Sequence, residues 1–262
     1  MTQVSISGRS TRASGRASTD AANARSNVVK AQLRLRELIL EGQLPAGSRI
    51  SELWVVEQLG VSRTPVRAAL ARLQEEGFLE PIPSGGYAVR SFTEDDVWDA
   101  IEVRGTLEGL AARLAAERGT SPQVLRDLQA CVDEIDDILQ GELTEDKFSA
   151  YVSANESFHR ILAAACRSEV VERQLEKATA FPFASPSGFV MVQSVVPDAH
   201  EILVLAQAQH RAVIDAIERR EGARAEALMR EHARIAHRNL KSVLDNHKAF
   251  AKLQGSALIR RY

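Results

Sequence analysis

The sequence predicts a mainly α-helical protein, in which an N-terminal winged helix-turn-helix is followed by an all-α helical bundle. Three observations predict this fold: helix-ending and helix-capping residues around Gly60, two short apolar segments joined by a proline- and glycine-rich turn, and helical periodicity from residue 93 to about residue 247. The chain is 45% apolar and 26% charged, which is typical of a globular protein. No apolar run approaches the ~20 residues that span a membrane, so no membrane partner is expected.

The N-terminal residues are basic. Residues 1–26 carry a formal charge of +3 amid Ser, Thr, Ala and Gly, and they lack the apolar region of a secretory signal. We expect a disordered basic arm, with a transit peptide as the alternative. The formal charge is +1 over residues 27–92 and −6 over the remainder, so affinity for DNA is expected from the N-terminal third. The two cysteines lack metal-ligand spacing and suit a reducing cytoplasm.

Three helices are predicted before residue 76. Residues 28–44 show helical periodicity, which is broken at Gly42 and again at residues 45–47. Gly60 stands where a second helix would end in a left-handed conformation, and Ser62 can cap a third. Pro65 falls in the first turn of this third helix, where the missing N–H has no cost.

The third helix has the pattern of a recognition helix. Val66, Leu70 and Leu73 recur at helical spacing and are expected to face a core. Arg63 and Arg67 share another face near the N-terminal end, from which an arginine can bond guanine O6 and N7, and neighbouring hydroxyls can bond phosphates. The alternative is an ordinary helix with two solvated arginines.

A β-hairpin is predicted after this helix, because the apolar segments 77–82 and 87–90 are joined by Pro83-Ser84-Gly85-Gly86. With this wing, residues 35–89 resemble the DNA-binding domain of GntR-family transcription regulators. The resemblance implies that Arg63 and Arg67 contact operator bases. It also implies that Ser62 and Thr64 contact phosphates and that Gly85 and Gly86 form the wing tip. The chain departs from the family's fatty-acid branch at Leu53, where that branch has an arginine, so the half-site is expected to differ.

The rest of the chain is predicted to be helical. We expect helices near 93–118, 121–140, 145–166, 169–180, 199–220 and 222–250. Thr93 and Asp96 form a loose capping box for the first of them. The proline-broken apolar segment 181–198 is long for a connector and is expected to pack inward. The expected boundaries are a basic arm (1–26), a DNA-binding domain (27–92), a helical domain (93–250) and a C-terminal tail (251–262).

Four residues of the helical domain are candidates for one metal site. Asn155 and His159 are four apart and share a helix face, while His210 and His232 lie on two later helices that short connections would make antiparallel. Three imidazoles with one oxygen suit a divalent metal such as Zn or Ni and leave positions open for a ligand. The alternative is that these histidines are unrelated surface or core residues.

The order of these residues resembles the FCD ligand-binding domain of the FadR subfamily of GntR regulators. The resemblance implies that Asn155, His159, His210 and His232 hold a divalent metal, whose coordination a carboxylate effector completes, and that Arg104 faces the effector. Aspartate is common where this chain has Asn155, so weaker metal binding is expected. Residues 99–119 and 151–164 are most similar to VanR-type repressors, which implies a small aromatic acid such as vanillate as effector.

We expect a cytoplasmic, nucleoid-associated homodimer that reads an inverted repeat on double-stranded DNA and is released by a small carboxylate effector. Two alternatives stay open. The first is a metal-dependent hydrolase with an appended DNA-binding domain, although Glu156 and Glu231 adjoin ligands in sequence and are expected to point about 100° away from them. The second is a regulator whose metal is purely structural.

Overall fold

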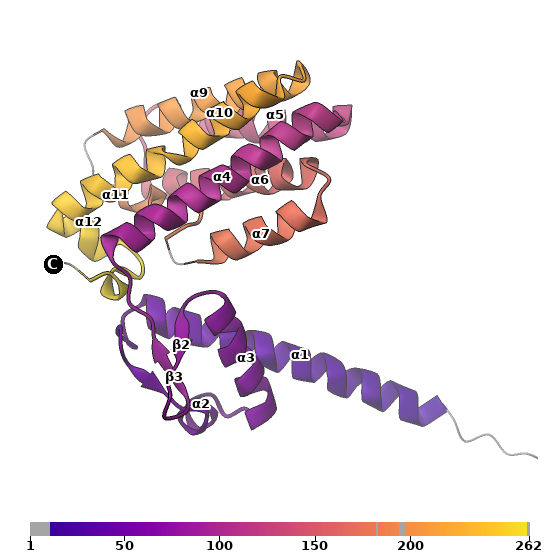
Figure 1. Cartoon of the computed structure of the whole chain (residues 1–262), viewed down its shortest axis with the longest axis vertical. Coiled ribbons are helices and arrows are strands. Elements are labelled where there is room, and N and C mark those ends of the chain that lie inside the picture. Colours follow the sequence, from indigo (N-terminus) through magenta and orange to yellow (C-terminus); the bar gives the residue numbers. More distant parts are fainter. Residues whose placement is uncertain (1–10, 182, 194–197, 261–262) are drawn as a thin grey trace, which may run out of the picture. The chain divides into compact units, whose positions relative to one another are not determined.

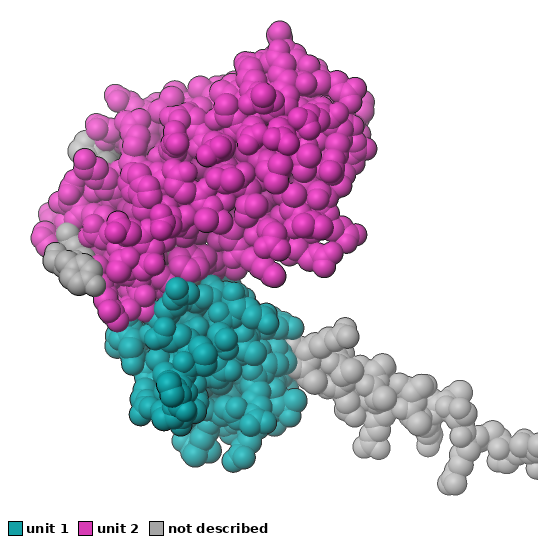
Figure 2. Space-filling model, in the orientation of Figure 1, with its two compact units in different colours: residues 1–39, 43–90 teal, residues 40–42, 91–262 magenta. Residues whose placement is uncertain are grey.

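The computed structural model describes residues 11–181, 183–193 and 198–260, with side chains from residue 26 onward. The chain divides into two compact units (Figures 1 and 2). Unit 1 contains residues up to 39 and residues 43–90, and unit 2 contains residues 40–42 and the chain from residue 91 onward. No helix within the described ranges is long and apolar enough to cross a membrane.

Unit 1 is a winged helix-turn-helix, as predicted. Its elements are α1 (Thr11–Leu40, ending at the boundary with unit 2), β1 (Arg49–Ile50), α2 (Glu52–Leu59), α3 (Arg63–Glu75), β2 (Leu79–Pro81) and β3 (Tyr87–Val89). The strands form an antiparallel sheet in the order β1-β3-β2, in which Leu79 pairs with Val89 and Arg49 with Ala88. The predicted hairpin is thus confirmed, whereas the short strand β1 was not predicted.

The start of α1 differs from the expected arm. Residues 1–10 lie outside the described range, but residues 11–26, which were expected to be disordered, are helical. The composition explains the difference, because this stretch contains no proline and is rich in alanine and arginine, which are strong helix formers. The polarity of the stretch was therefore a poorer guide than its helix propensity.

The helix-turn-helix itself forms as the sequence indicates. Gly60 ends α2 with φ +63°, and Val66, Leu70 and Leu73 of α3 are fully buried. Ser62 occupies the N-cap position of α3, but its hydroxyl makes no capping hydrogen bond, contrary to the prediction. The hydroxyl is therefore not needed to start the helix.

Unit 2 is a helical bundle, as predicted. Its elements are α4 (Glu94–Arg118), α5 (Pro122–Ile138), α6 (Glu145–Ala165), α7 (Glu169–Ala180), α8 (Val190–Gln193), α9 (Ala199–Glu218), α10 (Gly222–Ala233), α11 (Ile235–Asp245), α12 (His247–Lys252) and the 3-10 turn η1 (Ser256–Leu258). The capping box of Thr93 and Asp96 is present at the start of α4. Helix α4 packs against α6, α7, α9 and α10 and is central to the unit (Figure 1).

The last predicted helix, 222–250, is three helices in the structure. At Arg234 the N–H bonds the carbonyl of Glu231 three residues back, which ends α10. Asn246 has an extended backbone, and its side chain caps α12 by accepting from the N–H groups of Lys248 and Ala249. Asparagine favours such caps over helix interiors, so the second break follows from a residue type that the periodicity did not weigh.

Close contact between α4 and α10 depends on glycine. A Cβ atom added to Gly105 would lie 2.6 Å from the Cβ of Ala233, and one added to Gly109 would lie 2.7 Å from Cγ of Arg230. These distances are shorter than real Cβ contacts, so the two glycines allow the helix backbones to approach. The approach fixes the position of α10 relative to α4.

Gly105→Ala should lower the free energy of unfolding by about 1–2 kcal/mol. Overpacking a methyl group costs about 1–3 kcal/mol, and the better helix propensity of alanine returns at most about 1 kcal/mol. Urea unfolding followed by circular dichroism measures the change, with Thr106→Ala, an exposed position on the same helix, as the control. A Gly105→Ala protein more stable than the control would show that α10 shifts freely.

Two further segments fold onto unit 2. Segment 181–198 packs inward as expected, since Phe183, Ser187 and Phe189 are buried, although Pro182 and residues 194–197 lie outside the described range. Residues near the C-terminus, expected to be a tail, form backbone hydrogen bonds with Leu40 and Phe92 of the same unit. The N–H of Gly255 bonds the carbonyl of Leu40 (3.0 Å), and Phe92 exchanges hydrogen bonds with the backbone of residues 258 and 260 (both 2.8 Å).

Candidate metal centre and nucleic-acid interface

Three of the four predicted metal ligands converge inside unit 2. His159 of α6, His210 of α9 and His232 of α10 are buried, and their candidate ligand atoms lie within 4.8 Å of one another. The Nε2 atom of His232 lies 3.2 Å from Nε2 of His210 and 3.3 Å from Nε2 of His159. The structure therefore brings His159 together with two histidines that are 51 and 73 positions later in the chain.

Hydrogen bonds on the far side of two rings fix which nitrogen faces the centre. Nδ1 of His159 lies 2.7 Å from Oε1 of Glu108, and Nδ1 of His210 lies 3.1 Å from Oε1 of Gln207. The amide nitrogen of Gln207 donates to the carbonyl of Val132 (2.6 Å), so its oxygen must be the atom that faces His210. Both Nδ1 atoms are therefore donors, and in the neutral rings the lone pairs of both Nε2 atoms face the centre.

The surroundings keep the imidazole rings of His210 and His232 neutral. Burial lowers the pKa of His210 well below its usual value, and the neighbouring His159 and Arg211 lower it further. Burial also lowers the pKa of His232, with His210 and His159 adding to the effect. A neutral imidazole is the form that binds a metal, so His210 and His232 have the protonation state that metal ligands require.

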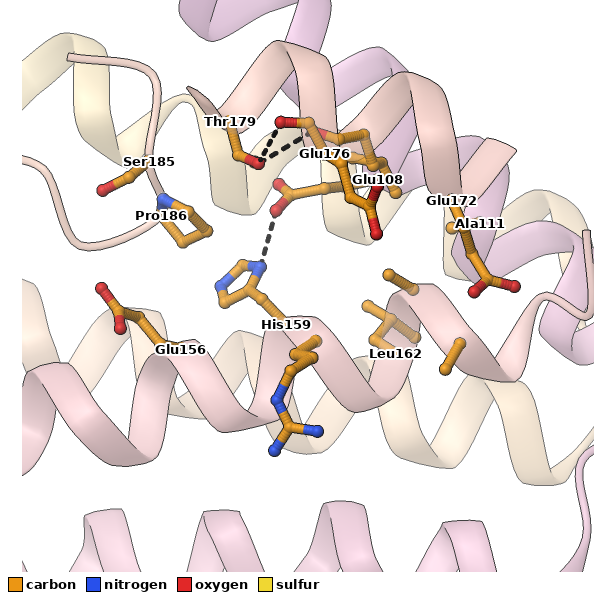
Figure 3. A pocket seen from close by; sticks show the side chains of 14 residues that line it. Glu108, Ala111, Glu156, His159, Leu162, Glu172, Glu176, Thr179, Ser185 and Pro186 are labelled. Atoms are coloured by element: carbon orange, nitrogen blue, oxygen red, sulfur yellow. Dashed lines mark hydrogen bonds and ion pairs between the residues drawn. The ribbon is translucent and has the colours of Figure 1, made fainter. Parts of the chain in front are cut away.

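Glu108 is a residue of this site that sequence reasoning missed. Its carboxylate bridges two partners, because Oε1 contacts His159 (Figure 3) and Oε2 accepts from Nη1 of Arg104 at 2.9 Å. Burial alone would raise the pKa of Glu108, but Arg104 and His159 lower it to about 2. The ionised carboxylate thus orients the His159 ring, as carboxylates commonly do for metal-binding histidines.

Arg104 and Asn155 are near the histidines but have protein partners. Arg104, which was expected to face an effector, forms the ion pair with Glu108, and both side chains are at least 95% buried. The amide nitrogen of Asn155 donates to Oγ of Ser187 (3.1 Å), so its carbonyl oxygen is the atom left for a cation. Arg104, Asn155 and His232 together line a small cavity of about 30 Å³, which we call the inner cavity.

A larger cavity lies beside His159. This outer cavity, of about 380 Å³, is bounded by α4, α6, α7 and residues 185–186, and it is lined by Glu108, His159 and Leu175 together with three acidic residues, Glu156, Glu172 and Glu176 (Figure 3). Glu156, which was expected to point away from the ligand face, therefore lies on the wall that His159 also lines.

Two other histidines of unit 2 have partners outside the cluster. His237 stacks on Trp98 with ring centroids 3.7 Å apart, and its Nε2 lies 3.1 Å from the carbonyl of Trp98. His200 lies 3.0 Å from the carbonyl of Leu139. Neither belongs to the cluster.

The predicted DNA-reading residues lie on the surface of unit 1. Arg63, Ser62, Thr64 and Arg67 are exposed at the start of α3. Nε of Arg67 donates to Oε1 of Glu52 (2.7 Å), a residue of α2, which holds the guanidinium across the turn of the motif. This ion pair was not foreseen from the sequence.

The wing places two glycines at its turn. Gly85 and Gly86 have φ of +89° and +88°, and a Cβ atom on Gly86 would lie 3.0 Å from the carbonyl oxygen of Ile50. Both positions therefore require glycine. Arg49 of β1 donates to the hydroxyl of Ser84 beside them, which adds a cationic side chain next to the wing turn.

Comparison with known proteins agrees with this architecture. The profile of bacterial regulatory proteins of the gntR family matches residues 27–89, and that of the FCD domain matches residues 99–235. A probable D-xylose utilization operon transcriptional repressor from Paenarthrobacter nicotinovorans is 29% identical over 196 residues, which cover 74% of this chain and 80% of that protein. The putative L-lactate dehydrogenase operon regulatory protein of Escherichia coli (strain K12) is 28% identical over 247 residues, covering 84% and 88%.

Among solved structures, E. coli McbR/YncC shares the fold with a TM-score of 0.57 at 18% identity, over 84% of this chain and 97% of that one. The matched families and relatives are transcriptional regulators and not enzymes, which contradicts the hydrolase alternative. Because the FCD profile covers more than half of the chain and the gntR profile covers unit 1, the protein belongs to the GntR family of transcriptional regulators and carries an FCD domain.

Proposed function

We propose that the protein represses a catabolic operon and that a small carboxylate effector, bound at a metal in unit 2, releases it from its operator. The convergence of three buried Nε2 atoms, 3.2 and 3.3 Å apart, carries this proposal. Neutral imidazoles that point lone pairs at one another are favourable only when a cation or a proton lies between them. Operon repressors among the relatives support the same direction of regulation.

His159, His210 and His232 would hold the metal, with the carbonyl oxygen of Asn155 as the fourth ligand. Three imidazole nitrogens and one neutral oxygen suit Zn or Ni. The bound metal would supply a Lewis-acidic centre with a position open to a carboxylate. In the protein, Glu108 and Gln207 keep two of the rings oriented toward that centre.

The effector would reach the inner cavity, because His232, Asn155 and Arg104 line it. At about 30 Å³ this cavity holds no more than one or two water molecules. Binding therefore requires its walls to move apart, and the effector shifts the regulator toward whichever arrangement has the larger cavity. An aromatic acid such as vanillate would demand a larger movement than a short aliphatic acid.

Operator recognition would use Arg63 and Arg67 on bases, with Ser62 and Thr64 on phosphates and the wing turn at Gly85 and Gly86 near the minor groove. All lie on unit 1, and the four α3 residues are exposed. A cytoplasmic homodimer would place two such helices on an inverted repeat. The formal charges of residues 1–26 (+3) and residues 27–92 (+1) are both positive, which favours binding to the phosphate backbone.

Arg63→Ala should weaken binding to the operator by roughly 5- to 150-fold, which corresponds to the ~1–3 kcal/mol of one bidentate base contact. Fluorescence anisotropy of metal-loaded protein on DNA from upstream of its own gene measures this, with and without added carboxylates. Arg173→Ala, which removes the same exposed charge from α7, is the control. Equal affinity of the Arg63 variant and the control would exclude Arg63 as a reader.

A further inference from the structure

The inner cavity is surrounded by polar atoms that have no hydrogen-bond partner. Among the described residues, seven buried side-chain nitrogen or oxygen atoms have none, and four of these belong to residues that line this cavity: Arg104 Nε, Gln193 Oε1, His232 Nδ1 and Asn239 Oδ1. Buried polar groups in proteins are nearly always paired, and each unpaired one costs ~1–3 kcal/mol. Such a cluster around one cavity indicates a polar ligand.

The chemistry of the four atoms is divided between donors and acceptors. Nε of Arg104 is always a donor. With a cation on Nε2 of His232, the Nδ1 atom carries the ring hydrogen and is a donor as well. The Arg104 donor, on α4, matches an acceptor oxygen of a carboxylate. The Nδ1 atom of His232 lies on the side of the ring away from the metal, so it matches a second oxygen of the ligand.

Gln193 of α8 and Asn239 of α11 present the opposite chemistry. Their unpartnered atoms are amide oxygens, which accept hydrogen bonds and would face a carboxylate with no attraction. A hydroxyl group is the neutral donor that satisfies an amide oxygen. The remaining wall is apolar, since Phe189, Val190 and Leu203 also line the cavity, and this suits a short carbon chain.

We propose that the effector is a small hydroxycarboxylate, held by its carboxylate at Arg104 and by a hydroxyl group that accepts from Nδ1 of His232 and donates to an amide oxygen of Gln193 or Asn239. The inference deepens the proposed function and rests on it, because it assumes that a carboxylate binds in this unit. Gln193 and Asn239 then select for the hydroxyl group. A site that is built to bond a hydroxyl rejects the analogue that lacks it, because its own buried atoms are left unpaired.

The test compares hydroxy acids with their deoxy analogues on metal-loaded, full-length protein. The pairs are lactate with propionate, malate with succinate, and 4-hydroxybenzoate with benzoate, measured by isothermal titration calorimetry. For at least one pair the hydroxy acid should bind roughly 10-fold or more tightly. In the double variant Gln193→Leu with Asn239→Leu this ratio should fall toward one, while it is kept in Gln174→Leu, an exposed amide on α7.

The variants should fold, because leucine replaces an unpartnered polar atom, and unchanged or higher melting temperatures without ligand check this. Binding of acids without preference for the hydroxyl group, or an equal preference in the double variant, would overturn this inference and leave the proposed function standing. A metal-loaded protein that binds none of the six acids would overturn both.

Discussion

His232→Ala is expected to lower the affinity of the protein for Zn²⁺ or Ni²⁺ by more than about 100-fold. Loss of an outer hydrogen-bond partner of a ligand costs roughly 10- to 100-fold, and loss of the ligand itself must cost more. His232 is the most informative position, because its Nε2 atom is the one within 3.3 Å of both other Nε2 atoms. Competition with a chromogenic chelator measures the affinity.

Two further variants, a control and one with an expected intermediate loss, are measured in the same experiment. His200→Ala removes a histidine that is outside the cluster and should leave metal affinity unchanged. Glu108→Gln keeps the shape of the side chain but removes the charge that orients His159, so an intermediate loss is expected. Equal metal affinity of the wild type and His232→Ala would contradict the metal site, and unfolding of unit 2 by chelation without any response to carboxylates would favour a structural metal.

The sequence was sufficient for the parts of the site that depend on local spacing. Asn155 and His159 share a helix face because they are four apart, and the three histidines fall within segments that were predicted to be helical. The same holds for the DNA-reading helix, where Gly60 and the buried positions of α3 follow from local rules.

Residues whose role depends on packing between helices could not be found this way. Glu108 is one helical turn after Arg104, a spacing that is ordinary for a solvated ion pair, and only the packing of α4 against α6 buries it beside His159. The unpartnered amides of Gln193 and Asn239 are likewise visible only after α8 and α11 have been placed around one cavity. These residues have their roles because they are buried, and sequence patterns predict the burial of polar residues poorly.

Arg104→Met should lower the free energy of unfolding by ~3–5 kcal/mol, the cost of leaving a buried charge without its partner. Arg104 and Glu108 are 2% and 4% exposed, so water cannot replace the missing guanidinium. Denaturant unfolding measures the change. Arg173→Met, which breaks an exposed pair with Glu169 on α7, is the matched control and should cost no more than about 1 kcal/mol.

The double variant Arg104→Met with Glu108→Gln decides whether the charge or the shape of Arg104 matters. Neutralising both members removes the unpaired charge, so most of the lost stability should return. If the double variant is as unstable as Arg104→Met, the loss comes from packing and the ion pair contributes little. A recovered fold that no longer binds carboxylates would separate the two roles of Arg104, because stability then depends on its pairing with Glu108 and effector binding on its guanidinium in the inner cavity.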